Sequence, residues 1–436
     1  MILSDRSNEI IKKCQKISNK NHELDKNTKT FLLDIYKHLI EANSKLEGFN
    51  YNNIREITPV RSKLLKENEF ISEDIRNYIN DKSLYEIKYK WKINERSIVL
   101  DFIVFSENDV KNSELKKYDR YAYYVFLILY LLFFYANKEC SDHQNIYIYM
   151  TPYKREMPDI ENEILGIKHL NGGLSYVCPK TGQIIIYRKE EWFKVFIHES
   201  FHNLGFDFAN MHLSEFNKKF QSIFQINSEF NIYEAYCEFW ALTLNIIIVS
   251  FVNLQKSHDI NTFINNFKFY MSIEQCFTYI QVNKVLNYMG LKYTDLYYKT
   301  KESKKLREKF REKTNVFAYY ICKMILLSDY NKFIEWCIAY NNNYFDFNKT
   351  NLGLNLLFEY ILKNYNSNSL LNDINSTYLI TGNKTLPYKN RTRTRTRTRT
   401  RTRTRNRTRT RTRTRNKNKK VIKERLSLCL SSIELK

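Results

Sequence analysis

The stretch His198-Glu199-Ser200-Phe201-His202 constrains this chain more than any other part of its 436-residue sequence. Two histidines four residues apart can both reach one metal ion if the stretch is helical, because positions i and i+4 share a helix face. The glutamate beside the first histidine completes the HExxH pattern, which binds Zn²⁺ and activates a water molecule. The motif therefore predicts a helix that carries two metal ligands.

The residues around the motif predict an amphipathic helix with defined ends. Its expected first turn holds Glu190 and Glu191, whose negative charge complements the helix macrodipole. Gly205 is expected to end the helix, because glycine adopts the left-handed conformation at low cost. An apolar face runs between these ends, formed by Phe193, Phe196, Ile197, Phe201 and Leu204.

Alternating patterns ahead of this helix predict a small, mostly antiparallel sheet. Apolar and charged side chains alternate over 87–93, and an apolar run over 97–106 follows a short turn, which is typical of a hairpin. A further strand is expected at 145–151. Residues 173–178 and 183–188 flank a Pro-Lys-Thr-Gly turn. They predict a second hairpin that leads directly into the HExxH helix.

The rest of the chain predicts helices, so the expected fold class is α+β and predominantly helical. Glycine and proline are scarce, with 9 and 5 residues, as in chains with few tight turns. The expected regions are 1–80 (helical), 81–254 (sheet and HExxH helix), 255–385 (helical lobe), 386–420 (disordered Arg-Thr tract) and 421–436 (short C-terminal segment).

Two apolar runs require a choice between a membrane span and a core helix. Residues 121–136 form an uncharged run of 16, and residues 239–252 form one of 14. Both are shorter than the ~18–20 residues of a spanning helix. The first run contains five tyrosines, whose hydroxyl groups prefer a hydrogen-bond partner or water. We therefore predict two buried core helices and no membrane span.

The eight cysteines are scattered and form no CxxC pair. This spacing predicts reduced, mostly buried thiols in an intracellular protein rather than a disulfide framework. The N-terminal sequence MILSDRSNEIIKKC lacks the apolar stretch of a signal peptide. We therefore expect a protein that is not secreted and that acts in the cytoplasm or inside a particle. The cysteines are Cys14, Cys140, Cys178, Cys237, Cys276, Cys322, Cys337 and Cys429.

A hydrolytic zinc site has three protein ligands and an open fourth position, so the third ligand must lie outside the motif. Glu234 and Glu238 are four residues apart on an expected second helix. One of them can bind the metal while the other orients a ligand histidine through its free ring N–H. Asp207, five residues after His202, is an alternative ligand, and His212 is another.

The motif together with this glutamate pair resembles the gluzincin group of zinc metallopeptidases, in which HExxH is followed by a ligand glutamate and by an acid four residues further on. The resemblance implies that His198, His202 and Glu234 bind Zn²⁺, that Glu199 is the base and that Glu238 orients a ligand. Glutamate at 238 departs from the more usual aspartate, so the roles of the two glutamates could be exchanged.

Residues 172–208 also resemble a group of zincin-like proteins encoded by large DNA viruses. This resemblance covers about the middle half of the chain and implies a peptidase-like fold, a viral origin and a location in the host cytoplasm or the virion. A metzincin pattern fits less well. Gly205 matches it, but Phe208 stands where the next ligand is expected, and His212 comes four residues too late.

Peptide hydrolysis also needs a group that stabilises the oxyanion on the substrate carbonyl, and Tyr319 or Tyr320 are candidates. Strand 173–178 could offer its edge to an extended peptide. The expected function is therefore hydrolysis of a protein or peptide substrate with one Zn²⁺ ion. Glu199 would take a proton from the attacking water and return it to the leaving amine.

Residues 391–416 repeat Arg-Thr almost without interruption and contain 13 arginines. With Lys417, Lys419 and Lys420 they carry 16 of the net +23 charges, which leaves +7 for the rest. Such a tract can bind nucleic acid non-specifically through phosphates, or it can be an expanded repeat that forms a solvated, disordered tail. The competing function is thus a catalytically inactive, zincin-fold component of a virion or nucleoprotein that uses residues 391–420.

Overall fold

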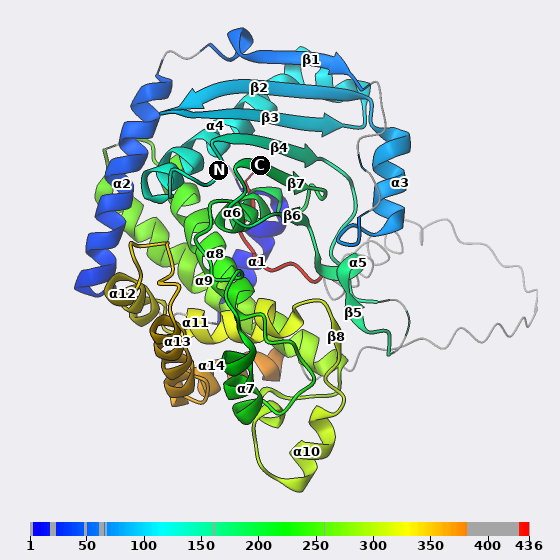
Figure 1. The fold of residues 1–436 in the computed structure, drawn as a ribbon, viewed down its shortest axis with the longest axis vertical. Helices are drawn as coiled ribbons and strands as arrows, with labels where there is room; N and C mark the ends of the chain where they lie inside the picture. The colour runs from blue at the N-terminus through cyan, green and yellow to red at the C-terminus, as the bar shows by residue number, and fades with distance from the viewer. Residues whose placement is uncertain are drawn as a thin grey trace, which may run out of the picture.

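The computed structural model has the predicted α+β, predominantly helical fold, and its main sheet is small and mixed (Figure 1). Most of the helices lie together on one side of this sheet and form the larger part of the molecule. The structure describes residues 3–17, 23–47, 50–60, 65, 68–158, 160, 162–256, 258–381 and 427–435.

The N-terminal region is helical, as expected, and also contributes one strand. Its helices are α1 (Asp5–Ile17), α2 (Lys26–Leu46) and α3 (Glu73–Lys82), with the 3-10 turn η1 (Tyr51–Asn53) after α2. Strand β1 (Arg55–Pro59) has four exposed residues among its five. An edge strand with so little burial has no apolar alternation, which is why the sequence pattern did not indicate it.

The remaining strands of the main sheet are β2 (Tyr85–Ile93), β3 (Arg96–Val104), β4 (His143–Tyr149), β6 (Gly173–Ser175) and β7 (Thr181–Ile186). With β1 they form one sheet in the order β1-β2-β3-β4-β7-β6. Both predicted hairpins are confirmed, since β2 pairs antiparallel with β3, and β6 pairs antiparallel with β7.

Two strand pairs of this sheet are parallel, which the strand patterns did not indicate. Strand β4 runs parallel to both β3 and β7. The 3-10 turn η2 (Glu107–Val110) and helix α4 (Asn112–Tyr135) connect β3 to β4, and a helical crossover brings the next strand back in the same direction. A second, two-stranded parallel sheet consists of β5 (Leu165–Gly166) and β8 (Glu312–Lys313).

The two faces of the main sheet are covered differently. Phe102, Ile184 and Ile186 belong to the large core under the helices, whereas Ile103 and Ile185 belong to a small cluster with α3. This follows from the period of two in a strand, which sends neighbouring side chains to opposite faces. The large core is one contiguous cluster that includes residues from Leu3 to Leu435.

The chain after the sheet is almost entirely helical, as predicted for 255–380. The long helices α8 and α9 pack against each other, and α8 lies in the centre of the molecule (Figure 1). The helices after β5 are α5 (Ile167–Leu170), α6 (Trp192–Asn203), α7 (Ser214–Ile223), α8 (Ile232–Val252), α9 (Ile260–Tyr288), η3 (Tyr293–Leu296), α10 (Lys301–Arg307), the π-helical η4 (Phe317–Cys322), α11 (Lys323–Ser328), α12 (Tyr330–Tyr340), α13 (Asn351–Asn364) and α14 (Asn368–Thr381).

Both apolar runs lie in buried helices, as predicted. Residues 121–136 fall almost entirely within α4, and residues 239–252 form the C-terminal two thirds of α8. Because α8 begins at Ile232, it is 21 residues long, which by length and composition is enough to cross a membrane. However, 94% of its apolar window is buried inside the protein, so α8 is a core helix.

The prediction that all cysteines are reduced thiols is wrong for two of them. Cys140, after α4, and Cys178, after β6, form a disulfide with a Cα–Cα distance of 4.7 Å. They are 38 residues apart in sequence and meet only because β4 lies beside the β6-β7 hairpin, so spacing could not indicate the pair. The free cysteines among the described residues are all buried, namely Cys14, Cys237, Cys276, Cys322, Cys337 and Cys429.

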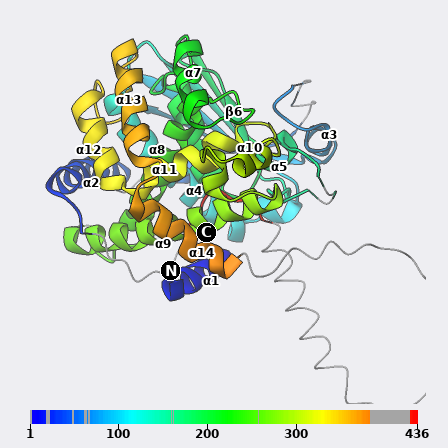
Figure 2. The same ribbon diagram turned by 90° about the horizontal axis from the view of Figure 1, so that it is seen from below.

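The C-terminal segment, residues 427–435, lies inside the molecule (Figure 1, red). Leu435 pairs with Leu3 in an isolated bridge, so the two ends of the described chain meet; Figure 2 marks both near α1 and α14. The Arg-Thr tract and the predicted disorder at 386–420 lie outside the described residues. The tract is nevertheless followed by buried chain, so it is not a terminal tail.

Candidate metal centre

The predicted helix is α6, and all of its residues are buried, those outside the predicted apolar face included. It ends at Asn203, and Gly205 follows in the left-handed conformation with φ 68°. Its start differs from the prediction, because Glu190 and Glu191 precede the helix instead of lying in its first turn. Glu191 takes a left-handed conformation (φ 56°) and forms a buried ion pair with Arg155. The Glu191 carboxylate binds Arg155 in this ion pair and makes no hydrogen bond with the N–H groups of the first turn of α6.

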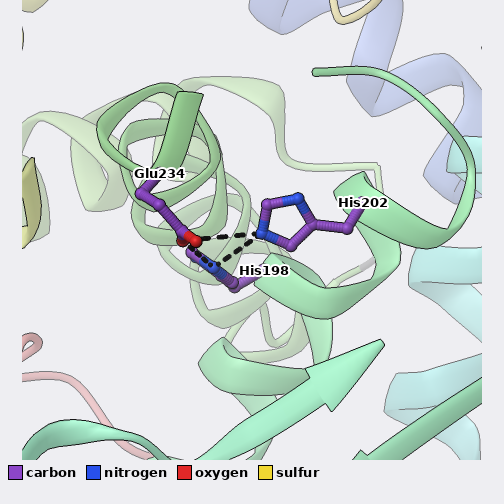
Figure 3. Close-up of side chains that lie close together, drawn as sticks. All are labelled: His198, His202 and Glu234. Carbon is purple, nitrogen blue, oxygen red and sulfur yellow. Dashed lines mark hydrogen bonds and ion pairs between the residues drawn. The ribbon is translucent and has the colours of Figure 1, made fainter. Parts of the chain in front are cut away.

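The structure brings His198, His202 and Glu234 together at one point (Figure 3). The Nε2 atoms of the two histidines are 3.1 Å apart. Glu234 Oε2 lies 3.1 Å from the first Nε2 and 3.5 Å from the second. Glu234 lies in the first turn of α8, which packs against α6. The three atoms therefore converge from two helices.

The other ring nitrogen of each histidine faces a buried carboxylate. His198 Nδ1 lies 3.1 Å from Glu238 Oε1, and His202 Nδ1 lies 2.8 Å from Asp207 Oδ2. A carboxylate at Nδ1 favours the proton on that nitrogen and leaves the Nε2 lone pair free to bind a metal. Glu234 thus lies at the point of convergence, while Glu238 and Asp207 lie behind the two rings.

These residues fit a metal ion. Two nitrogen ligands at ~2.1 Å in tetrahedral positions are ~3.4 Å apart, which is close to the 3.1 Å between the two Nε2 atoms. The lone pairs of two ring nitrogens and a carboxylate that face one largely buried point repel each other unless a proton or a cation lies between them. His198, His202 and Glu234 could therefore hold a metal ion.

The electrostatics of the site also favour positive charge there. Burial lowers the pKa of His198, but the adjacent carboxylates of Glu234 and Glu238 outweigh it, so the pKa lies above its usual value. Burial raises the pKa of Glu234, but hydrogen bonds with His198 and His202 outweigh it and hold the pKa well below its usual value. A metal ion bound between the histidines and Glu234 can supply the positive charge that a proton would otherwise supply.

Two further residues hold the glutamates in place, and neither was predicted. Lys194, one turn before His198 on α6, places Nζ 2.6 and 2.7 Å from the two carboxylate oxygens of Glu238. Asn315 donates from Nδ2 to Glu234 Oε1 at 3.1 Å, which leaves Oε2 to face the histidines. Lys194 precedes His198 by four residues, so the two side chains share one face of the helix. The sequence around Lys194 did not indicate that it would pair with Glu238.

Glu199 lies beside the ligands and against strand β6. Its Oε2 accepts a hydrogen bond from Ser175 Oγ at 2.8 Å, and burial raises its pKa above the usual value. Gly173 makes this approach possible, because a Cβ there would lie 2.8–3.0 Å from side-chain atoms of Ile186, Val195 and Glu199. Strand β6 is therefore pressed against the helix at the position of the expected base.

The two candidate tyrosines point to different places. The Tyr319 ring centroid is 6.1 Å from that of His198, so Tyr319 lies at the site. Tyr320 instead donates its hydroxyl proton to the carbonyl oxygen of Leu428 at 2.6 Å and is buried away from the histidines. Both tyrosines lie in η4, and π-helical turns are frequent at functional sites.

A second group of potential ligands shares His202. His202 Nδ1, Asp207 and Cys237 also lie within 4.8 Å of one another, with the Cys237 sulfur 3.8 Å from Nδ1. Asp207 and Cys237 are completely buried, whereas the Glu234 side chain keeps 12% exposure. Since a hydrolytic metal site needs an open position, the group with Glu234 is the one suited to chemistry. His212 is exposed and contacts Ser214 instead.

Fold and site together define the class of this protein as an α+β chain with a buried His-His-Glu centre that could hold a metal ion. Comparison with known proteins does not narrow this class, since no protein-family model, no curated protein and no solved structure matches the chain.

Proposed function

We propose that this protein is a zinc-dependent peptidase that uses His198, His202 and Glu234 as ligands and Glu199 as its base. One observation carries the proposal: two Nε2 atoms and a carboxylate converge on one point, and each histidine has a carboxylate behind it. Nitrogen and oxygen ligands with an open fourth position are typical of catalytic zinc. The HExxH order places Glu199 next to the first ligand.

When bound, zinc supplies Lewis-acid chemistry, polarising a carbonyl and lowering the pKa of water to ~7. Glu199 is rotated by ~100° from His198 around the helix, so it lies beside the metal position and not in it. Ser175 Oγ donates a hydrogen bond to Glu199 Oε2. This leaves Glu199 Oε1 to accept the proton of the attacking water. The same oxygen then donates the proton to the leaving amine. The raised pKa of Glu199 makes its carboxylate a stronger base, which favours uptake of the proton from the attacking water.

Two further features support a peptide as the substrate. Strand β6 is the last strand of the main sheet, so its outer edge can pair with an extended peptide. Tyr319 lies near His198, where a hydroxyl group can donate to the oxyanion formed on the carbonyl. Tyr176, directly after β6, is 61% exposed and can contact side chains of a bound peptide.

The test combines metal analysis with the Glu199→Gln variant. We expect about one zinc per chain in both proteins, because Glu199 is not a ligand. Cleavage of an unstructured peptide library, measured by mass spectrometry, should fall ~10²–10⁴-fold in the variant. Chelation should abolish cleavage by the wild type, and added zinc should restore it. A wild-type protein without stoichiometric zinc, or cleavage that is undiminished in the variant, would contradict the proposal.

A second candidate function is binding of nucleic acid by a catalytically inactive component of a virion or nucleoprotein. The observation that favours it is the sequence of residues 391–420, which carries 16 positive charges and no acid. Such a tract binds phosphates with strong salt dependence and without base recognition. Nucleic-acid binding by this tract is compatible with peptidase activity, since the two depend on different parts of the chain. The second function differs from the first in its lack of catalysis.

Deletion of residues 391–416 tests the second function, because it leaves the buried residues 427–435 in the protein. We expect salt-sensitive binding to DNA or RNA to disappear and zinc content to stay unchanged. Replacement of the arginines in the tract by glutamine is the matched control for chain length. Unchanged nucleic-acid binding after both alterations would refute this function.

A further inference from the structure

The C-terminal segment, residues 427–435, behaves as core although it belongs to no long helix or strand. Its apolar side chains are at most 7% exposed, namely Leu428, Cys429, Leu430, Ile433 and Leu435. The chain that precedes it, residues 382–426, lies outside the described residues. A short segment thus contributes to the core although it is far in sequence from the residues that it contacts.

Both ends of the segment pair with other parts of the backbone. Ser427 forms an isolated bridge with Glu156, and Leu428 N donates to Arg155 O at 2.9 Å. At the other end, Leu435 pairs with Leu3 in the second isolated bridge. The segment is therefore held at both ends by distant stretches of the chain and bends at Leu430 and Ser432 between them.

Two buried carboxylates bind the N–H groups in the middle of the segment. Glu191 accepts from the N–H groups of Leu430 and Ser431. Glu274, in α9, accepts from the Ser431 hydroxyl at 2.6 Å and from the next two N–H groups at 2.8 and 2.9 Å. We call Glu191, its partner Arg155 and Glu274 the anchor. Hydrogen bonds to charged acceptors are among the stronger ones in proteins.

Side chains of the body bind the carbonyl oxygens of the segment as well. The donors come from α8, α9, η4 and α11, so four elements contribute to one short stretch. The bonds are Tyr320 to Leu428 O at 2.6 Å, Gln281 to Cys429 O at 2.6 Å, Lys323 to Leu430 O at 2.9 Å and Asn245 to Ile433 O at 3.0 Å. Side chains that pair with the backbone on both sides are what a protein uses to bind an extended peptide.

Three of the residues that bind the segment also lie close to parts of the metal centre. Glu191 is the residue that precedes helix α6, which carries both histidines. Tyr320 is adjacent to Tyr319, whose ring faces His198. Lys323 is completely buried, and its charge acts on the carboxylate of Glu238, which faces His198. Glu191 and Tyr320 thus connect the segment to the helix that carries the histidines and to the turn that carries Tyr319.

We propose that residues 427–435 bind the body of the protein as a peptide ligand, and that residues 382–426 only tether this ligand. The seated segment holds α6 and η4 in the arrangement that the metal centre requires. The first statement is independent of the proposed function, whereas the second rests on it. Chain continuity between α14 and the segment is then dispensable once the segment is seated.

The experiment uses the full chain with residues 391–416 replaced by the recognition sequence of a site-specific protease. After cleavage, we expect the C-terminal fragment to co-elute with the body in gel filtration. Zinc content should persist while the fragment is bound and fall in body that has lost the fragment after prolonged dilution. A fragment that separates at once from a folded, unchanged body would overturn the proposal.

Two neighbouring serines provide a matched pair of variants. Ser431 and Ser432 are both completely buried, but only Ser431 uses its hydroxyl, which donates to Glu274. The Ser432 hydroxyl has no hydrogen-bond partner among the described residues. We expect Ser431→Ala to speed dissociation of the cleaved fragment ~10- to 100-fold, and Ser432→Ala to leave it nearly unchanged. Equal rates in the two variants would contradict the proposed seating.

The result is distinguishable from failure of the proposed function. If the intact chain binds no zinc, the peptidase proposal fails, while retention of the fragment still tests the seating. If zinc is bound and stays bound after the fragment has left, the link between segment and metal centre is refuted. Neither conclusion requires a variant that lacks residues 427–436. The test therefore does not depend on whether such a variant folds.

Discussion

Two groups of buried carboxylates lie near helix α6, one just before its first residue and one beside His198 and His202. Their charges meet different partners. In the anchor, Glu191 pairs with Arg155 and Glu274 accepts hydrogen bonds from the C-terminal segment. In the metal centre, the Glu234 carboxylate faces two histidine nitrogens that also need a positive partner. The anchor is complete within the protein, and the metal centre is not.

The comparison shows that burial of charge does not by itself mark a functional site. A buried carboxylate whose oxygens all meet donors is part of the structure. Lone pairs that converge on a partly exposed point indicate a site for a cation. The same substitution in the two groups should therefore change different properties, which the following predictions use.

The largest effect is expected from Glu191→Gln in the anchor. The substitution leaves the Arg155 guanidinium buried without its ion-pair partner, and breaking a buried pair costs about 3–5 kcal/mol of the free energy of unfolding. Denaturant unfolding measures this loss. Because Glu274 still binds residues 427–435 and keeps them seated, added zinc should stabilise the variant by about the same amount as the wild type. A variant that loses this increment would weaken the contrast between the two groups.

Glu234→Gln in the metal centre should give the reverse result. Zinc at 100 times its dissociation constant stabilises a folded protein by about 2.7 kcal/mol, because it binds only the native state. We expect the variant to lose this increment, since a neutral amide is a poorer metal ligand than the carboxylate it replaces. Thermal unfolding with and without zinc measures the difference. An unchanged increment would show that Glu234 does not bind the metal.

A smaller effect is expected from Asp207→Asn, which alters the group behind His202. Asp207 lies 2.8 Å from His202 Nδ1, and loss of such a partner weakens metal affinity ~10–100-fold. Titration with zinc in competition with a chelator measures the change. Asp81→Asn, at an exposed position on α3, is the matched control and should bind zinc like the wild type. A complete loss of zinc would instead assign Asp207 as a ligand.

The smallest effect concerns Asp101, a buried carboxylate that belongs to neither group. Burial raises its pKa to about 6, and Lys88 at 3.6 Å only partly offsets this. Because the folded-state pKa exceeds the unfolded value of about 3.9, the native state binds more protons between these values. The stability that Asp101 costs is therefore greatest above about pH 6 and disappears below about pH 4.

Asp101→Asn should consequently stabilise the protein at about pH 8, by on the order of 1 kcal/mol, and have little effect near about pH 4. Unfolding free energies of variant and wild type across this range measure the difference. A gain that is the same at both pH values would show that the charge of Asp101 is not the cause.

Local patterns predicted the elements that carry the site. The i, i+4 spacing of His198 and His202 required a helix, Gly205 marked its end, and both hairpins followed from alternation. These features depend on residues that are near in sequence, so their geometry is determined by the helix or strand itself. The same rule showed that Glu234 and Glu238 share one face of a second helix.

Local spacing could not decide which of these glutamates faces the metal, because that depends on how α8 is rotated and shifted against α6. The contacts of Lys194 with Glu238 and of Asn315 with Glu234 fix the arrangement, and both join parts of the chain that are far apart in sequence. The Cys140–Cys178 disulfide and the parallel strand pairs escaped prediction for the same reason.

The sequence by itself thus determined the helices, the hairpins and the set of candidate ligands, because each is encoded within a few residues. Only the tertiary structure decided that Glu234 converges with the histidines, that Asp207 and Glu238 lie behind them, and that residues 427–435 return to the core beside the anchor. These outcomes depend on the burial of apolar surface between elements that are distant in sequence. The packing of these elements brings charged residues together that lie far apart along the chain.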